Sequence, residues 1–185
     1  EILHEYVENL ARHRFSLAST PPLPRIPWEK FPIQSEGRMG TGLHFDPGRE
    51  LELAGPKFEV MRNGLTVGFW LRTTASNLGV FVRHQWSDRP SGYWFSLVDG
   101  VLTGTIGLGT KEPDPLHADV KAAYPEDGGW HHVAFAVAPE KLSLLIDGQA
   151  TAEQALERPL SPSYGGQVYL TAAAEGFDLD ELRWA

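Results

Sequence analysis

Residues 127–148 read Asp-Gly-Gly-Trp-His-His-Val-Ala-Phe-Ala-Val-Ala-Pro-Glu-Lys-Leu-Ser-Leu-Leu-Ile-Asp-Gly, and this stretch decides the fold. With a period of two, one face of the first strand carries His131, Val133, Phe135 and Val137. Pro139-Glu140 predicts a turn, after which apolar residues alternate again until Asp147-Gly148 ends a second strand. The stretch is therefore predicted to be a β-hairpin with one apolar face.

Short alternating segments with glycine-rich turns continue on both sides of this hairpin. We expect strands near 42–46, 50–54, 65–73, 79–84, 92–98, 101–107, 130–138, 141–147, 167–172 and 178–184. Asp99-Gly100 is a strong signal for a two-residue hairpin turn. So many short strands, with almost no helix between them, predict an all-β fold of two packed antiparallel sheets.

The chain has 185 residues, 42% of them hydrophobic, which suits one soluble domain with a sizeable core. A net charge of −8 argues against nucleic acid or an anionic membrane as partner. The absence of cysteine excludes disulfides and thiolate metal sites. No apolar run reaches the length of a membrane span, so membrane attachment is expected only through a segment before Glu1.

Three regions are predicted. Residues 1–18 have apolar positions at helical spacing and predict a short amphipathic α-helix. Nothing caps it, as in a helix cut from a longer one, but a short helix that packs on the β-domain is the favoured alternative. Residues 19–37 contain five prolines and predict an extended linker. Residues 38–185 form the β-domain. Within it, the proline-containing segment 110–129 is long for a hairpin connection and is expected to be a functional loop.

Tryptophan and histidine supply the first candidate site residues. Trp70, Trp130 and Trp184 lie within expected strands, and we expect them in the core. His131 and His132 are adjacent on a strand and therefore point to opposite faces, so they cannot both bind one ion without a bulge.

A ligand site is expected around two other tryptophans. Trp86 lies in a polar loop with Arg83 and Asp88, and Trp94 alternates with other aromatic residues. An exposed indole offers a flat face to a sugar ring, while a loop ring folded onto the sheet edge remains the alternative. The predicted ligand-binding residues are Arg83, Trp86, Asp88 and Trp94.

Calcium is the one candidate cofactor. Asp178 and Asp180 share a face of the last strand, about 7 Å apart, and Asp46 could approach them. Carboxylate oxygens suit Ca²⁺. The alternative, a surface acidic pair beside Arg183 or a turn-capping aspartate, is favoured about two to one.

No catalytic residues are predicted. The segment Glu175–Glu181 does not have the Glu-x-Asp-x-x-Glu spacing of jelly-roll glycosidases, which use paired carboxylates. A nucleophile elbow and a phosphate loop are also missing.

The central hairpin motif, together with residues 40–46, 65–73 and 177–184, resembles laminin G-like domains of the concanavalin A-like jelly-roll class. The four segments occur in the order typical of that family and cover roughly residues 38–185. The resemblance implies a β-sandwich, and calcium binding in many members; one fold hosts many functions.

The chain is accordingly predicted to be a non-enzymatic binding or adhesion module. It is expected to be extracellular or on the cell surface, with the periplasm as a further option, and to recognise glycan or protein through its loops or concave sheet. An alternative is a surface-filament subunit that contacts copies of itself, since pilin-like proteins are similar in having a long N-terminal helix before a β-rich head. A less favoured alternative is an accessory domain of a secreted enzyme.

Overall fold

The computed structural model describes residues 31–54, 64–85, 91–111, 114–156 and 167–185. The described residues form strands and contain no helix, and none of their segments is a helix able to cross a membrane. The helix expected over 1–18 and the linker up to residue 30 lie outside the described residues, so the filament hypothesis that depended on them stays a prediction. The strands are β1 Ile33–Gly37, β2 Gly40–Phe45, β3 Glu50–Ala54, β4 Leu65–Arg72, β5 Gly79–Gln85, β6 Ser91–Val98, β7 Val101–Lys111, β8 Asp114–Ala123, β9 Trp130–Ala138, β10 Lys141–Ile146, β11 Gln149–Ala155, β12 Gln167–Thr171 and β13 Phe177–Trp184.

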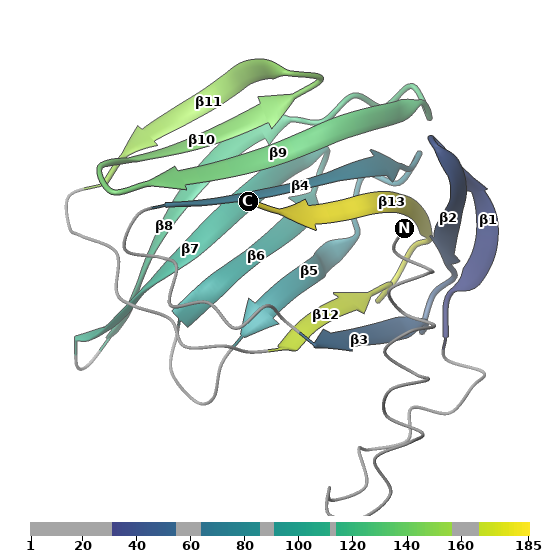
Figure 1. Cartoon of the computed structure of the whole chain (residues 1–185), viewed down its shortest axis with the longest axis horizontal. Helices are drawn as coiled ribbons and strands as arrows, with labels where there is room; N and C mark the ends of the chain where they lie inside the picture. Colours follow the sequence, from purple (N-terminus) through teal and green to yellow (C-terminus); the bar gives the residue numbers. More distant parts are fainter. Residues whose placement is uncertain (1–30, 55–63, 86–90, 112–113, 157–166) are drawn as a thin grey trace, which may run out of the picture.

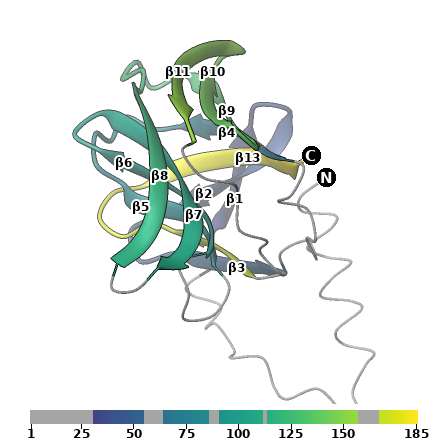
Figure 2. The same cartoon turned by 90° about the vertical axis from the view of Figure 1, so that its left-hand side faces the viewer.

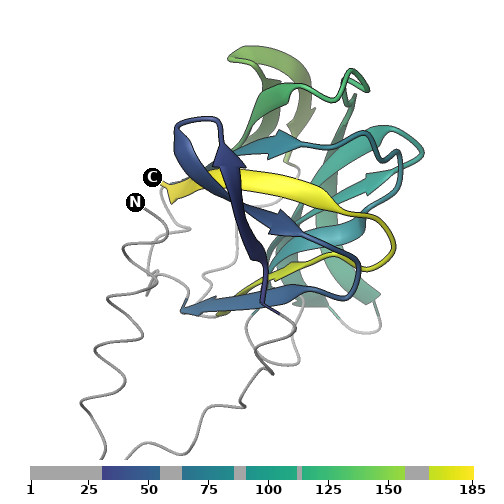
Figure 3. The same ribbon diagram turned by 90° about the vertical axis from the view of Figure 1, so that its right-hand side faces the viewer.

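These strands form two antiparallel sheets that pack face to face (Figures 1 and 2). The seven-stranded sheet has the order β1-β2-β13-β4-β9-β10-β11, and the six-stranded sheet has the order β3-β12-β5-β6-β7-β8. Strands close in space are often distant in sequence: β13 lies between β2 and β4, and its neighbour β2 pairs with β1 in a hairpin (Figure 3). The predicted all-β antiparallel sandwich is confirmed.

The core between the sheets is built from side chains that alternate along each strand. Phe69 and Phe135 come from the seven-stranded sheet, and Phe81 and Phe95 come from the six-stranded sheet. All four are fully buried. The Phe69 and Phe95 rings meet edge-on with centroids 4.9 Å apart, and Phe95 and Phe135 are 5.6 Å apart. Burying each ring contributes about 1.5–3 kcal/mol, and edge-to-face contact adds more.

The central hairpin has the predicted form. Val133, Phe135 and Val137 of β9 are buried, and the intervening residues are more exposed. The two-residue turn Pro139-Glu140 joins β9 to β10. Asp147 and Gly148 both have positive φ, 52° and 78°, as a type I′ turn requires. The same geometry occurs at Asp99-Gly100 between β6 and β7, where a hairpin was predicted.

Three strands were not expected from the sequence. β8 occupies much of segment 110–129, so the expectation of a long loop there is wrong. β8 is an edge strand that pairs only with β7, and its polar composition hides the strand pattern. β11 is also an edge strand, with six of its seven residues exposed. β1 pairs with β2 and extends the sandwich upstream of residue 38.

Candidate functional site

The outer surface of the six-stranded sheet carries a line of side chains from neighbouring strands. Arg83 in β5, Trp94 in β6 and Tyr169 in β12 each alternate with residues buried between the sheets. The register places Tyr169 opposite Arg83, and Arg83 opposite Trp94. Opposite residues of an antiparallel pair have Cβ atoms about 4.5–5.5 Å apart. Two of the predicted ligand residues, Arg83 and Trp94, are therefore direct neighbours on one face.

The line continues on both sides of this pair. Trp94 lies opposite Thr105, which lies opposite Asp119 in the edge strand β8. The Thr105 hydroxyl donates a 2.9 Å hydrogen bond to Asp119 Oδ1. At the other end, Glu52 of β3 lies opposite Tyr169. We call this line the aromatic row; it consists of Glu52, Tyr169, Arg83, Trp94, Thr105 and Asp119.

His117 of β8 lies next to the aromatic row. Its ring centroid is 6.2 Å from that of Trp94, with the planes at 51°. His117 and Tyr169 were missed as site residues by the sequence analysis. The alternation of Tyr169 with Val168 and Leu170 indicates that it points outward, but only the register shows what it lies beside.

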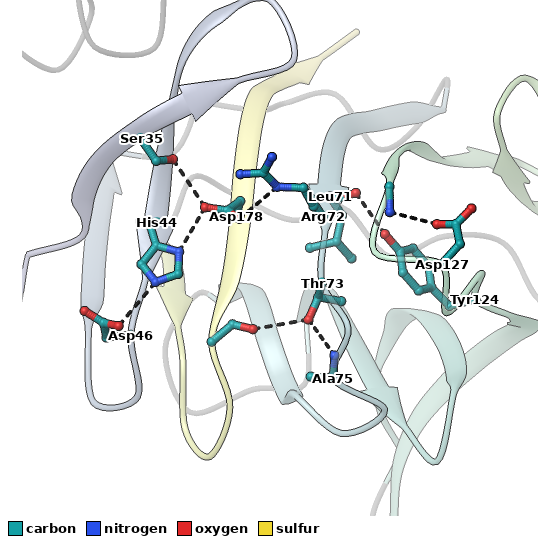
Figure 4. A network of polar contacts seen from close by, with 12 residues as sticks. Ser35, His44, Asp46, Leu71, Arg72, Thr73, Ala75, Tyr124, Asp127 and Asp178 are labelled. Carbon is teal, nitrogen blue, oxygen red and sulfur yellow. Dashed lines mark hydrogen bonds and ion pairs between the residues drawn. The ribbon is translucent and has the colours of Figure 1, made fainter.

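The outer face of the seven-stranded sheet also carries charged and aromatic side chains, but these contact one another. Across β2, β13, β4 and β9 the register reads His44, Asp178, Arg72, Trp130. Asp178 binds His44 Nδ1 at 2.9 Å and accepts a 3.0 Å hydrogen bond from Arg72 Nε (Figure 4). The Arg72 guanidinium carbon lies 4.8 Å from the centre of the Trp130 ring. Each charge in this ladder has a partner, which is typical of a structural arrangement.

The three predicted calcium ligands have other partners in this ladder and beside it. His44 lies between Asp178 and Asp46, with His44 Nε2 3.2 Å from Asp46 Oδ1 (Figure 4). Asp180 is buried and accepts backbone hydrogen bonds from Met39 and Glu181. No cluster of three metal-ligating side chains occurs within the described residues. Calcium at this place stays a prediction; the described contacts of these carboxylates are to nitrogen and hydroxyl groups of the protein.

The charge state of His44 follows from the same contacts. Partial burial lowers the pKa of His44, but the hydrogen bonds and charges of Asp178 and Asp46 outweigh it, and the net result is a pKa above 6.5. The two carboxylates therefore favour the protonated form of His44 relative to a free imidazole.

The expectation that Trp70 and Trp130 lie in the core is wrong. Both are half-buried on the outer face, because alternation gives the inward positions to residues such as Phe69. The Arg38 guanidinium carbon lies 5.1 Å from the centre of the Trp70 ring. Trp184 does pack against the core, as predicted.

The adjacent histidines point to opposite faces, as predicted. His132 contacts the Trp70 ring on the outer face, with centroids 5.2 Å apart. His131 lies between two carboxylates: its Nδ1 is 2.8 Å from Asp147 Oδ2 and its Nε2 is 2.8 Å from Asp127 Oδ1. We call Asp127, His131 and Asp147 the histidine clamp. The clamp ties the loop before β9 to the turn after β10.

The pKa values of the clamp residues shift in opposite directions: that of His131 is raised, and those of Asp127 and Asp147 are lowered. Burial lowers the pKa of His131, but Asp147 and Asp127 outweigh it and raise the net value above 6.5. The hydrogen bond from His131 lowers the pKa of Asp127. Burial raises the pKa of Asp147, but bonds from His131 and His132 outweigh it, and the net pKa is below 3.8. The contacts in the clamp thus favour a protonated His131 between two ionised carboxylates, relative to the same groups in the unfolded chain.

The arginines of the two outer faces differ in whether they contact other residues. Arg38 and Arg72 stack on tryptophans, and Arg183 pairs with Glu181 at 2.7 Å. The exposed Arg83, by contrast, has no hydrogen bond, ion pair or ring contact in the part of the chain that the structure describes. The predicted partners Trp86 and Asp88 lie outside the described residues. The aromatic row is therefore the surface with binding groups left for a ligand.

Comparison with known proteins gives a family. A laminin G-type family model, described as the concanavalin A-like lectin/glucanases superfamily, matches residues 48–184. A search of curated proteins finds no match.

Solved structures with the same architecture include several toxin binding domains. The binding domain of botulinum neurotoxin serotype G matches with a TM-score of 0.68 and 11% identity, over 83% of this chain and 41% of that chain. The binding domain of paraclostridial mosquitocidal protein 1 matches with a TM-score of 0.65 and 14% identity, over 83% and 42% of the two chains. The binding domain of botulinum neurotoxin DC, in a complex with rat synaptotagmin II, matches with a TM-score of 0.65 and 11% identity, over 83% and 41%. At these identities the likeness shows the fold alone, and the chain spans about two-fifths of each of these domains.

Proposed function

The chain belongs to the concanavalin A-like lectin/glucanases superfamily, and from this premise we propose that it is a non-enzymatic, extracellular or cell-surface binding module that recognises a glycan through its aromatic row. The observation that carries the proposal is the pairing of Arg83 with Trp94. Binding sites for small ligands combine aromatic surface with a few polar groups that set orientation. Trp94 and Tyr169 supply the aromatic surface. The polar groups come from Arg83, Asp119 and His117.

The surroundings of the row favour a glycan over a protein. Among the described side chains of this sheet, the exposed large apolar ones are Val80, Val98 and Val101, which lie towards the Asp99-Gly100 turn and away from the row. The centre of a protein–protein interface is usually apolar. A polar strip with isolated aromatic rings suits a hydroxyl-rich ligand better.

A binding role without catalysis is supported by the spacing of carboxylates. Glu52 and Asp119 lie at opposite ends of the aromatic row, on β3 and β8. Five strand-to-strand steps of about 4.8 Å place them roughly 24 Å apart. Glycosidases need two carboxyl groups about 5–9.5 Å apart, so this pair cannot act together on one glycosidic bond.

The test is a glycan array probed with the wild-type chain and two alanine variants, with and without Ca²⁺. Trp94→Ala removes the proposed platform, whereas Trp130→Ala is a matched control on the other sheet. We expect Trp94→Ala to weaken binding by about 2 kcal/mol, or about 30-fold in Kd. Trp130→Ala should retain wild-type affinity for the glycan.

Two results would contradict the proposal. One is an array that stays blank under both calcium conditions with folded protein. The other is a bound glycan whose affinity is equally affected by Trp94→Ala and Trp130→Ala, because the binding surface would then lie elsewhere. Thermal unfolding of each variant checks that the loss of binding does not reflect loss of fold.

A further inference from the structure

Arg83 is the one arginine among the described residues that has no partner in the described part of the chain. Arg38, Arg49, Arg72 and Arg183 each bind a ring, a carboxylate or a backbone oxygen. Tyr169 lies between Glu52 and Arg83 in the register, and no ion pair joins these two described residues. The Arg83 side chain is exposed near the middle of the aromatic row, and no described residue occupies its donors.

From this arrangement we propose that the ligand is an acidic saccharide, whose carboxylate binds Arg83 while its ring lies on Trp94. The inference depends on the proposed glycan binding by this face. A guanidinium is a planar fork that matches a carboxylate with two parallel hydrogen bonds. Because Arg83 and Trp94 are directly opposite each other, one sugar unit can contact both, with its ring on the indole and its carboxylate at the edge facing Arg83.

The charges around Arg83 limit the kind of acidic saccharide. Lys121, the other cation near the row, lies 3.8 Å from Asp119 Oδ2 and is partly neutralised by it. The chain as a whole has a net charge of −8. Among the described side chains of this face, a densely sulfated polymer would meet this negative field with Arg83 as the one unpaired cation. The row therefore suits a saccharide with an isolated carboxylate, such as a uronic or sialic acid, recognised at one point.

The hydroxyl of Tyr169 extends the polar contact surface beside Arg83. Burial raises the pKa of Tyr169, the Glu52 charge adds to this, and the Arg83 charge opposes it. The phenol stays protonated at neutral pH and donates a 2.5 Å hydrogen bond to Gln167 Oε1. Its oxygen lone pairs remain available to accept a hydrogen bond from a sugar hydroxyl.

The test compares saccharides that differ only in charge. Oligogalacturonate is titrated against its methyl ester, and sialyllactose against its own methyl ester, by calorimetry; the two acids distinguish uronate from sialate. The wild-type chain should bind at least one acid at least about tenfold more tightly than its neutral counterpart. Arg83→Gln should remove this preference, and Arg83→Lys should restore only part of it. Arg183→Gln, an exposed arginine on the other sheet, should leave the preference unchanged.

Each other outcome has a distinct meaning. Equal affinity for acid and neutral forms, or a preference that survives Arg83→Gln, overturns the acidic-ligand inference and leaves glycan binding intact. Binding to none of these saccharides, together with a blank array, overturns both proposals. Poly-glutamate is the last comparison. If it binds more tightly than either acidic saccharide, and Arg83→Gln abolishes this binding, the saccharide assignment is overturned, because the aromatic row would then bind peptide carboxylates.

Discussion

Replacing Asp147 by asparagine tests the histidine clamp with little other change. Asparagine tolerates the positive φ of 52° at this turn position. Its side-chain oxygen can still accept the 2.9 Å hydrogen bond that the His132 amide donates to Asp147 Oδ1. What is lost is the negative charge 2.8 Å from His131 Nδ1.

The size of the effect follows from exposure. The His131 side chain is 13% exposed but that of Asp147 is 49% exposed, so solvent screens the pair. We expect Asp147→Asn to cost about 0.5–1 kcal/mol of unfolding free energy near pH 6. For a chain of this size that lowers Tm by about 1–4 °C.

The loss should depend on pH in a defined direction. The pKa of His131 is raised on folding, so its contribution is fully present below pH 6.5 and disappears as pH rises through the folded-state pKa. The pKa values of Asp127 and Asp147 are lowered, so their contribution is present above pH 3.8 and disappears as pH falls through the folded-state values. The clamp therefore stabilises the fold most between about pH 4 and 6.5.

The assay is thermal unfolding of wild type, Asp147→Asn and Asp99→Asn at pH 6 and pH 9. Asp99→Asn makes the same change in the same kind of turn, with φ 51°, but without a histidine contact. We expect Asp147→Asn to lose more stability than Asp99→Asn at pH 6 and the difference to shrink at pH 9. Equal Tm changes for both variants, or a difference that is constant with pH, would refute the clamp.

Three further predictions concern the core and calcium. His84 is buried with both ring nitrogens unbonded, so His84→Leu should stabilise the fold by about 1 kcal/mol in urea unfolding. Burial lowers the pKa of His84, so wild type should lose stability as pH falls below 6.5 and the variant less so. A Cβ at Gly104 would lie 2.9 Å from the Phe135 ring, and Gly104→Ala should cost roughly 1–3 kcal/mol in the same assay. Because Asp178 already binds two cationic side chains, millimolar Ca²⁺ should not raise Tm; a rise that Asp178→Asn abolishes would contradict this.

Local patterns were sufficient for the elements that alternate strongly. β9 and β10 could be predicted because Val133, Phe135 and Leu144 recur with a period of two, and the Asp-Gly turns could be predicted from their tolerance of positive φ. β8 and β11 could not be predicted this way. They are polar edge strands whose extended form depends on hydrogen bonds to a neighbour, so their own residues carry little of the signal.

The candidate site divides in the same way. The sequence by itself predicted Trp94 and Arg83 as ligand-binding residues, because side-chain type and the alternation of Trp94 with Tyr93 and Phe95 are local properties of the chain. Only the tertiary structure decided that these two residues lie opposite each other. It also decided that Arg72 contacts Trp130 and Asp178, while Arg83 contacts no described residue. Strand register joins residues far apart in the chain, and it is set by the packing of both sheets against one core rather than by any single segment.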